Sequence, residues 1–265
     1  ISAATILSDG RRDYFVKHND PSRIDLFEAE ADGLQALERA GALRVPCPVC
    51  WGSDGTVSYL VLERLDLLGG TVRGAEAGRR LAELHRSGLD DGERAFGWHR
   101  DNYIGATHQP NGELADWVTF WRHHRLGFQL ELAARNGHGR ALQGPGERLL
   151  AGLDGLIGHR PSPSLLHGDL WGGNLGHLRD GTPVIYDPAV YRGDREADLA
   201  MTELFGGFGA DFYAAYRESW ALDPGYQTRK TLYNLYHVLN HLNLFGTGYL
   251  GQASSMIARL LAELG

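Results

Sequence analysis

The fold of this chain is decided by the stretch HGDLWGGN, residues 167–174, and by IYD, residues 185–187. Both mix polar side chains with apolar neighbours, which is typical of loops held on a buried scaffold. The first stretch supplies the carboxylate of Asp169 and the amide of Asn174, and the second supplies the carboxylate of Asp187. The turn sequence RDGT at residues 179–182 lies between them and predicts a β-hairpin that ends at Asp187.

These three side chains are suited to phosphoryl transfer. Mg²⁺ prefers oxygen ligands and commonly uses one or two protein groups together with substrate phosphates, so Asn174 and Asp187 are candidate ligands. Asp169 precedes Asn174 by five positions, the spacing of Asp and Asn in the catalytic loop of protein kinases. In that loop the Asp accepts a proton from the attacking hydroxyl. Alone, the pattern is also compatible with chance in a glycine-rich chain.

The first residues predict a β-hairpin. Residues 4–8 and 13–17 have strand-like composition and flank a turn, and Lys17 ends the second strand. A lone lysine in such a place is most often a solvated edge residue. Whether Lys17 has a functional role therefore depends on the segment that follows.

That segment predicts a helix with Ser22 as its N-cap and Gly41 as its C-terminal stop. Helical spacing places Glu30 on the same face as a buried apolar stripe of Phe27, Leu34 and Leu37. Because a lone buried carboxylate is costly, we expect Glu30 to pair with Lys17. The alternative is a Glu30 side chain that leaves the stripe at its edge.

The boundary between two parts of the chain is expected after residue 66. Residues 59–62, YLVL, predict a buried strand, and residues 67–71 read as a linker. The N-terminal part would then be residues 1–66 and the C-terminal part residues 67–265. Helices are predicted in the second part at residues 75–85, 116–136, 149–156 and 193–205, and from 211 onward with a break at 223–225.

Composition excludes several classes of protein. The chain has 26 Lys and Arg against 33 Asp and Glu, a formal charge of −7, which argues against a broad surface for nucleic acid or anionic membranes. No apolar run approaches the length of a membrane span and no export signal opens the sequence, so we expect a cytoplasmic protein. The two cysteines, Cys47 and Cys50, are too few for a disulfide framework.

Residues 167–201, from HGDLWGGN to YDPAVYRGDREADLAM, resemble the fructosamine kinase (ketosamine 3-kinase) family. That family belongs to the protein-kinase-like, aminoglycoside-phosphotransferase-like superfamily. Further segments that resemble it are YFVK at 14–17, FEAEA at 27–31, DNYIG at 101–105, QPNG at 109–112 and RLG at 125–127. The resemblance covers nearly the whole chain. It implies an α+β, two-lobed protein-kinase-like fold, with a small antiparallel-sheet lobe carrying one main helix and a larger, mostly helical lobe.

The resemblance also implies a nucleotide site. Lys17 would contact the phosphates of ATP and pair with Glu30. The backbone of Glu63, Arg64 and Leu65 would hold adenine between the lobes. Residues 1–66 would therefore form the ATP-binding lobe, and residues 67–265 the catalytic and substrate-binding lobe.

By the same resemblance, Asp169 would be the catalytic base or would orient the acceptor hydroxyl, and Asn174 and Asp187 would bind Mg²⁺. Trp171 would form part of the sugar pocket, with a purely packing role as the alternative. His167 and Asp198 would brace the catalytic loop without touching substrate.

Two departures from related patterns carry expectations of their own. The glycine-rich phosphate loop of the family would lie just before residues 1–4, so we expect it to be absent here and ATP binding to be weak. Asp187-Pro188-Ala189 replaces the Asp-Phe-Gly of protein kinases, so no activation-loop switch is expected.

The leading hypothesis is an ATP- and Mg²⁺-dependent kinase that phosphorylates a sugar hydroxyl, by resemblance the 3-hydroxyl, of a free or protein-bound ketosamine. The product would release the amine, which is a step of deglycation repair. The alternatives are a kinase of another small alcohol, such as an aminoglycoside or a choline-like acceptor, and a nucleotide-binding pseudokinase. We expect a monomer that binds neither nucleic acid nor membranes.

Overall fold

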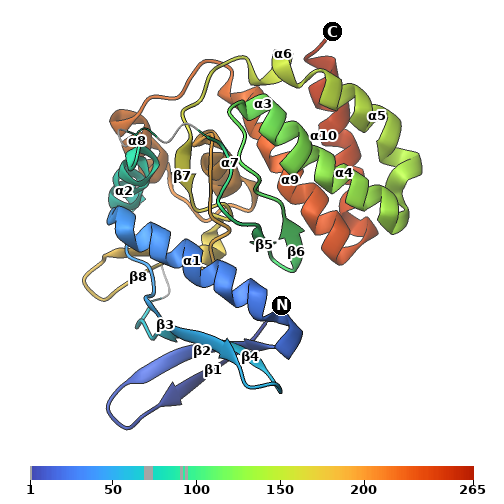
Figure 1. Ribbon diagram of the computed structural model, residues 1–265. Coiled ribbons are helices and arrows are strands. Elements are labelled where there is room, and N and C mark those ends of the chain that lie inside the picture. The colour runs from blue at the N-terminus through green and yellow to red at the C-terminus, as the bar shows by residue number, and fades with distance from the viewer. Residues whose placement is uncertain (1, 69–73, 90–91, 93–94) are drawn as a thin grey trace.

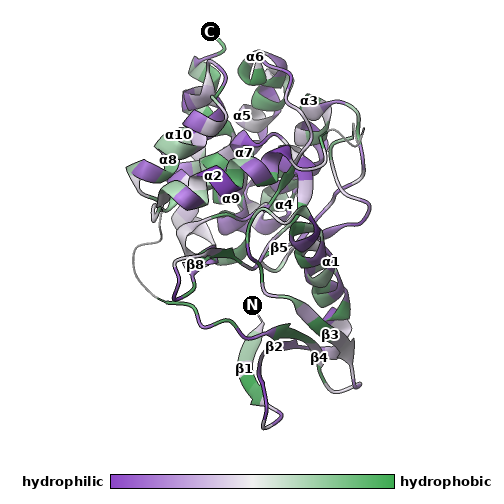
Figure 2. Cartoon of the chain, turned by 90° about the vertical axis from the view of Figure 1, so that its left-hand side faces the viewer, coloured by the Kyte–Doolittle hydropathy of each residue, from purple (hydrophilic) through white to green (hydrophobic). Residues whose placement is uncertain are grey.

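The computed structural model describes residues 2–68, 74–89, 92 and 95–265, which form two parts of unequal size (Figure 1). The smaller part is a four-stranded antiparallel sheet with helix α1, Ile24–Ala40, and the larger part is mostly helical. Helix α1 lies between the sheet and the helices in both views (Figures 1 and 2). This is the two-lobed α+β arrangement that the sequence predicted.

The sheet has the strand order β1-β2-β4-β3. Its strands are β1, Ala3–Ser8; β2, Asp13–Asn19; β3, Pro48–Ser53; and β4, Ser58–Glu63. The hairpin of β1 and β2 was predicted, and Lys17 of β2 lies opposite Leu60 of β4. Strand β4 is buried on one face only, because Ser58, Leu60 and Leu62 alternate with half-buried residues.

Helix α1 begins differently from the prediction. Pro21 opens a 3₁₀ turn, Pro21–Arg23, and the side chain of Asp20 caps this turn by accepting a hydrogen bond from the Ser22 amide. Asp20, not Ser22, is therefore the capping residue, since the fixed φ of proline suits the first position of a helical turn. The predicted stop is confirmed, because Gly41 ends α1 with a φ of 67°.

The larger part contains a long helical segment that is kinked near its middle. Asp116 caps it by accepting a hydrogen bond from the Thr119 amide at 2.7 Å. The predicted end at Asn136 is confirmed, because Gly137 takes a non-helical φ of 93° and a second helix follows after this kink. The whole segment comprises α3, Trp117–Phe120; a π-helical turn, Trp121–Gly127; α4, Phe128–Ala133; a second π-helical turn, Ala134–His138; and α5, Gly139–Ala151.

The helix predicted at residues 149–156 is divided at Gly152 between α5 and α6, Leu153–Ile157. Gly158, with a φ of 61°, ends α6 before the prolines at 161 and 163. The remaining helices are α2, Gly74–Arg86; α7, Glu196–Leu204; α8, Ala210–Ser219; α9, Tyr226–Phe245; a 3₁₀ turn, Thr247–Tyr249; and α10, Leu250–Ala262. These helices carry hydrophobic and hydrophilic residues in alternation (Figure 2), as expected where one face is buried.

Among the described residues of the larger part, three short antiparallel strand pairs lie next to the polar loops. They are β5, Asn102–Ile104, with β6, Thr107–Gln109; β7, Ser164–Leu166, with β10, Tyr191–Gly193; and β8, Leu175–His177, with β9, Pro183–Ile185. The HGDLWGGN stretch follows β7, and Asp187 follows β9 as predicted. Strands β7 and β9 therefore position the start of the loop that carries Asp169 and of the loop that carries Asp187.

Two hydrophobic clusters form the core of the described part of the chain. One lies wholly in the larger part and contains the aromatic residues of the long helix, Trp117, Phe120 and Trp121. The other joins the two parts, because Phe27 and Leu37 of α1 share it with Leu165, Val190 and others from the larger part. Burying a side chain of this size contributes about 1.5–3 kcal/mol. Helix α1 is thus bound into both parts of the molecule.

The connection between the two parts is only partly described. Residues 69–71 of the predicted linker lie outside the described residues, and Leu68 makes an isolated bridge to His177. The boundary after residue 66 stays a prediction. In the described part of the chain, no helix has the length and apolar character needed to cross a lipid bilayer.

Candidate active site

The loop after β7 brings Asp169 and Asn174 together. Asn174 stands at the end of a 3₁₀ turn, Gly172–Asn174, and its Nδ2 donates to the Asp169 carbonyl at 2.9 Å. The same Nδ2 lies 3.4 Å from Asp169 Oδ2 and 3.4 Å from the Asp187 carbonyl oxygen. One amide group therefore connects the two loops that the sequence singled out.

His167 and Asp198 hold this loop from behind. The amides of His167 and Gly168 donate to the Asp198 carboxylate at 2.8 and 2.9 Å. His167 Nδ1 accepts from the Asp169 amide at 3.2 Å, so the ring proton is on Nε2, 3.0 Å from the Tyr186 carbonyl oxygen. Burial lowers the pKa of His167 and keeps it neutral. The imidazole thereby ties Asp169 to the segment that leads into Asp187.

His85 was missed by the sequence analysis. It is fully buried on α2, with Nε2 3.2 Å from Asp198 Oδ2 and Nδ1 2.8 Å from the Tyr216 hydroxyl. Burial would raise the pKa of Asp198, but the hydrogen bonds from His85 and Gly168 outweigh it and hold that pKa below its usual value. The only sequence signal was a histidine beside the buried Leu81 and Leu84.

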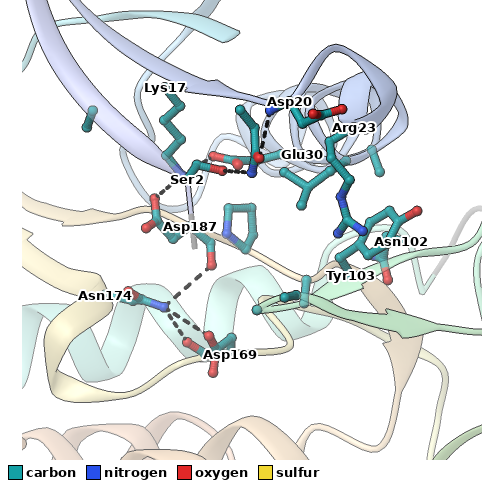
Figure 3. A pocket seen from close by; sticks show the side chains of 18 of the residues that line it. Ser2, Lys17, Asp20, Arg23, Glu30, Asn102, Tyr103, Asp169, Asn174 and Asp187 are labelled. Atoms are coloured by element: carbon teal, nitrogen blue, oxygen red, sulfur yellow. Dashed lines mark hydrogen bonds and ion pairs between the residues drawn. The ribbon is translucent and has the colours of Figure 1, made fainter. Parts of the chain in front are cut away.

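Lys17 contacts two carboxylates (Figure 3). Its Nζ lies 2.6 Å from Glu30 Oε1, which confirms the expected pair, and 2.7 Å from Asp187 Oδ1. Burial alone would lower the pKa of Lys17, but the charges of Glu30 and Asp187 raise it, so the amine stays protonated. Burial raises the pKa of Glu30. The cation is thus held between the two lobes of the molecule.

Asp187 has an unusual backbone. Its φ is 57°, and no other described residue except glycine has a positive φ. Such a conformation costs on the order of 1–3 kcal/mol and persists only where the surroundings impose it. Here the Ala189 amide donates to the His167 carbonyl at 2.8 Å. Gly168 permits this close approach, because a Cβ on it would lie 2.0 Å from the Ala189 oxygen.

These residues line a cavity of about 730 Å³ (Figure 3). Lys17, Asp169, Asn174 and Asp187 all face it. The Asn174 amide oxygen and the half-exposed Asp187 carboxylate are hard oxygen donors, so the donor set fits Mg²⁺. Burial, followed by the charges of Asp187 and Asp198, raises the pKa of Asp169 to about 7. A carboxyl group with such a pKa suits proton transfer near neutral pH.

Residues 63–65, which were predicted to hold adenine, do not line this cavity. The Glu63 amide donates to the Cys47 carbonyl at 2.9 Å, and the Glu63 carboxylate pairs with Arg44. Arg64 pairs with Asp13. These side chains are engaged within the smaller part, so any role of residues 63–65 toward adenine falls on the backbone and stays a prediction.

A second cavity, of about 310 Å³, adjoins the first. Gly105, Asp169 and Trp171 line both. The second cavity is walled by aromatic side chains, with the Trp171 ring centroid 6.2 Å from that of Phe205 in an edge-to-face arrangement. Its other wall residues are Ile104, Met201, His237, Asn240, His241, Leu244 and Phe245. Asp169 therefore stands where a polar cavity meets an aromatic one.

Comparison with known proteins points to one family. Residues 1–263 match the family model described as fructosamine kinase. A probable ketoamine kinase of Synechocystis is 49% identical over 264 residues, which cover 98% of this chain and 87% of that protein. A rice protein-ribulosamine 3-kinase is 42% identical over 268 residues, covering 100% of this chain and 77% of the rice protein.

Solved structures give the same result. A candidate fructosamine-3-kinase from Haemophilus somnus 129PT has a TM-score of 0.89 at 30% identity, covering 98% of this chain and 88% of the other. The aminoglycoside phosphotransferase APH(4)-Ia, as a thermostable mutant, has a TM-score of 0.60 at 16% identity, covering 99% and 94%. The latter likeness establishes the protein-kinase-like fold alone. With the family model matched from end to end, the chain belongs to the fructosamine kinase family.

Proposed function

We propose that this protein is a kinase that uses ATP and Mg²⁺ to phosphorylate the 3-hydroxyl of ketosamines, in the repair of early glycation. The observation that carries the proposal is the place of Asp169, which lines both the polar cavity of Lys17 and Asp187 and the aromatic cavity of Trp171. A phosphoryl group entering from one side would meet an acceptor hydroxyl entering from the other. The names of the Synechocystis and rice relatives support a ketosamine as the acceptor.

In this reaction the acceptor oxygen forms a bond to the terminal phosphorus of ATP, and the bond from that phosphorus to the bridging oxygen breaks. ADP leaves with that oxygen. Asp169 orients the hydroxyl and accepts its proton, as its position and raised pKa permit. Lys17, held by Glu30, binds phosphate oxygens.

Asn174 and Asp187 are the proposed metal ligands. Mg²⁺ bound there would neutralise charge on the phosphates. His167 and Asp198 keep Asp169 in place through the backbone hydrogen bonds described above. The chain does little covalent chemistry of its own, since phosphoryl transfer depends chiefly on positioning and electrostatics.

Trp171 is the proposed wall of the sugar site. Its side chain is 39% exposed although tryptophan is usually well buried, and its indole faces both cavities. An indole face suits the apolar C–H face of a sugar ring. The aromatic residues beyond it, Phe205 and Phe245, suit the carbon chain of the amine that carries the sugar.

The proposal extends to the two parts of the chain, its location and its partners. Residues 1–66 form the ATP-binding lobe, residues 67–265 form the catalytic lobe, and the backbone of residues 63–65 holds adenine. The protein is a cytoplasmic monomer that binds neither nucleic acid nor membranes. The formal charge of −7 supports the absence of a broad contact with nucleic acid or anionic membranes.

The test is ATP consumption with four acceptors: fructoselysine, ribuloselysine, an aminoglycoside and choline. We expect turnover with the two ketosamines and a loss of about 10²–10⁴-fold in Asp169→Asn, which keeps the shape of the side chain but cannot accept the proton. Asp66→Asn, a change at an exposed aspartate, is the matched control. Phosphorus and proton spectra of the product identify the hydroxyl that is modified.

The other hypotheses give different results in the same assay. Turnover confined to the aminoglycoside or to choline would assign the protein to another small alcohol. Nucleotide binding without turnover of any acceptor would indicate a pseudokinase. Near-full activity of Asp169→Asn would refute the role of Asp169.

A further inference from the structure

Three buried amide side chains lie directly beneath the segment that follows Asp187. They are Asn102, Gln109 and Asn111, from the DNYIG and QPNG motifs, and none of them has a role in the reaction described above. Asn102 and Gln109 lie opposite each other in the β5–β6 pair, and the three side chains are 5%, 1% and 0% exposed. We call these three residues the amide network.

Hydrogen bonds within the amide network fix the orientation of its side-chain amide groups. Gln109 Nε2 and Asn111 Nδ2 both donate to Asn102 Oδ1, at 2.8 and 2.9 Å. Because its oxygen accepts twice, Asn102 presents its Nδ2 outward, and this group donates to the Val190 carbonyl at 2.7 Å. Gln109 Nε2 also lies 3.2 Å from the Ala189 carbonyl oxygen. The amide network therefore donates hydrogen bonds to two successive backbone carbonyls, those of Ala189 and Val190.

The far side of the amide network is anchored as well. Arg125 Nη2 donates to Asn111 Oδ1 at 2.7 Å, and the Tyr236 hydroxyl donates to Gln109 Oε1 at 2.5 Å. Arg125 is fully buried, and its guanidinium carbon lies 3.9 Å from the centroid of the Tyr191 ring. These donors fix the orientation of the Asn111 and Gln109 side-chain amides. If either amide were flipped, its NH₂ group would face another hydrogen-bond donor.

We propose that the amide network is a positioning device for the metal-side carboxylate. By binding the carbonyls of Ala189 and Val190, it holds Asp187 in its strained backbone conformation, and so keeps the Asp187 carboxylate beside Lys17 and the Asp187 carbonyl beside Asn174. The three residues act through the backbone and touch neither phosphate nor metal. This inference rests on the proposed function only in taking Asp187 as a metal ligand.

A merely structural role would have different consequences. If the amide network only filled the core, its loss would lower stability without a specific effect at Asp187. If it positions Asp187, its loss would loosen the backbone at residues 187–190 and weaken the binding of the metal–nucleotide complex. The acceptor site, formed by other residues, would keep its affinity.

The decisive variant is Asn102→Asp in the full chain. It keeps the oxygen that accepts from Gln109 and Asn111 and replaces the donor to Val190 with a carboxylate oxygen, which repels the Val190 carbonyl. Hydrogen exchange measured by mass spectrometry on peptides that cover residues 187–190 should be about tenfold faster. The Mg²⁺ concentration needed for half-maximal nucleotide binding should rise about three- to tenfold, with the KM of the acceptor unchanged.

Asn234→Ser is the control, because Asn234 is a buried amide on α9 outside the amide network. It should lower stability without changing exchange at residues 187–190. Tyr236→Phe is a second variant in case Asn102→Asp does not fold. It removes only the hydroxyl bound to Gln109, so it should act in the same direction by about threefold.

Unchanged exchange at residues 187–190 together with unchanged Mg²⁺ dependence, in whichever of the two variants folds, would overturn the proposal. Exchange and nucleotide binding need no acceptor. A wild-type protein that binds Mg²⁺ and nucleotide but phosphorylates no ketosamine would therefore refute the proposed function and leave this inference to be decided by the same measurements.

Discussion

His85 and Asp198 are in direct contact, with His85 Nε2 3.2 Å from Asp198 Oδ2, although 113 residues separate them in the chain. The Asp198 carboxylate in turn accepts hydrogen bonds from the backbone amides of His167 and Gly168. A residue of α2 thus supports the loop that carries Asp169.

We expect His85→Leu to lower the free energy of unfolding by about 1–3 kcal/mol, because the buried carboxylate of Asp198 loses a donor. Turnover should fall as well, since the loop at Asp169 loses support. Denaturant unfolding and kcat are the measurements. His123→Leu, at an exposed position, should change neither. Wild-type stability and kcat in the His85 variant would contradict this account.

Glu30→Gln should raise the KM for ATP about tenfold. The neutral amide no longer balances Lys17, which would then pair with Asp187 in place of phosphate. Glu28→Gln changes the same helix at a position where the Glu28 carboxylate is 45% exposed and 3.6 Å from Arg100, and it should leave KM unchanged. Equal effects of the two variants would show that the pair with Lys17 has no special part in ATP binding.

Trp171→Ala should raise the KM of the ketosamine about tenfold and leave the KM of ATP unchanged, because the indole lines the aromatic cavity beside Asp169. Trp51→Ala is a closely matched control. Trp51 is 38% exposed and Trp171 is 39% exposed, but Trp51 lies on strand β3, away from the aromatic cavity. If Trp171 only fills space, the variant will lose stability and keep its acceptor KM.

Gly168→Ala should abolish activity and reduce the yield of folded protein. The residue has a φ of 82°, and a Cβ would lie 2.0 Å from the Ala189 oxygen, so the two loops would have to separate. Gly251→Ala, on α10 with open space around it, should instead stabilise the protein by about 0.5–1 kcal/mol. Activity assays and thermal unfolding of both variants decide the matter.

The His159–Asp194 pair should make stability depend on pH. Burial alone lowers the pKa of His159, but the Asp194 carboxylate 2.9 Å from Nε2 raises it above the ordinary value of 6.5. A raised folded pKa gives stability that is fully present below pH 6.5 and is lost as the pH rises through the folded value. The free energy of unfolding should therefore fall as the pH rises above 6.5 through the folded pKa, and less steeply in His159→Gln. Parallel pH curves for the two proteins would refute this.

The parts of the fold that depend on local pattern were predictable from the sequence. The hairpin that carries Lys17, the stop at Gly41 and the strand that leads into Asp187 all depend on neighbours close in sequence. Strand β3 was missed, because its sequence PVCWGS contains Pro and Gly and its register shifts between Pro48 and Cys50. Pairing with β4 imposes that strand, and a local reading cannot see it.

Some residues of the site were likewise predictable from local sequence, and others were not. Spacing identified Asp169 and Asn174, the predicted hairpin delivered Asp187, and the buried position of Glu30 indicated Lys17 as its partner. His85 could not be found, because a single histidine on a helix has no pattern and its partner is remote in sequence. The amide network escaped for the same reason: its motifs were visible, but the carbonyls that they bind become neighbours only in the fold.

The hydrophobic cluster shared by α1 and the larger part bears on how this protein can be dissected. Phe27 and Leu37 pack with Leu165 and Val190, so a fragment that ends after β4 would present an apolar helix face to water. Such a fragment should self-associate when expressed alone. Split-enzyme designs cut after residue 66 would therefore need both halves to be produced together, and reconstitution of activity would report the docking of α1.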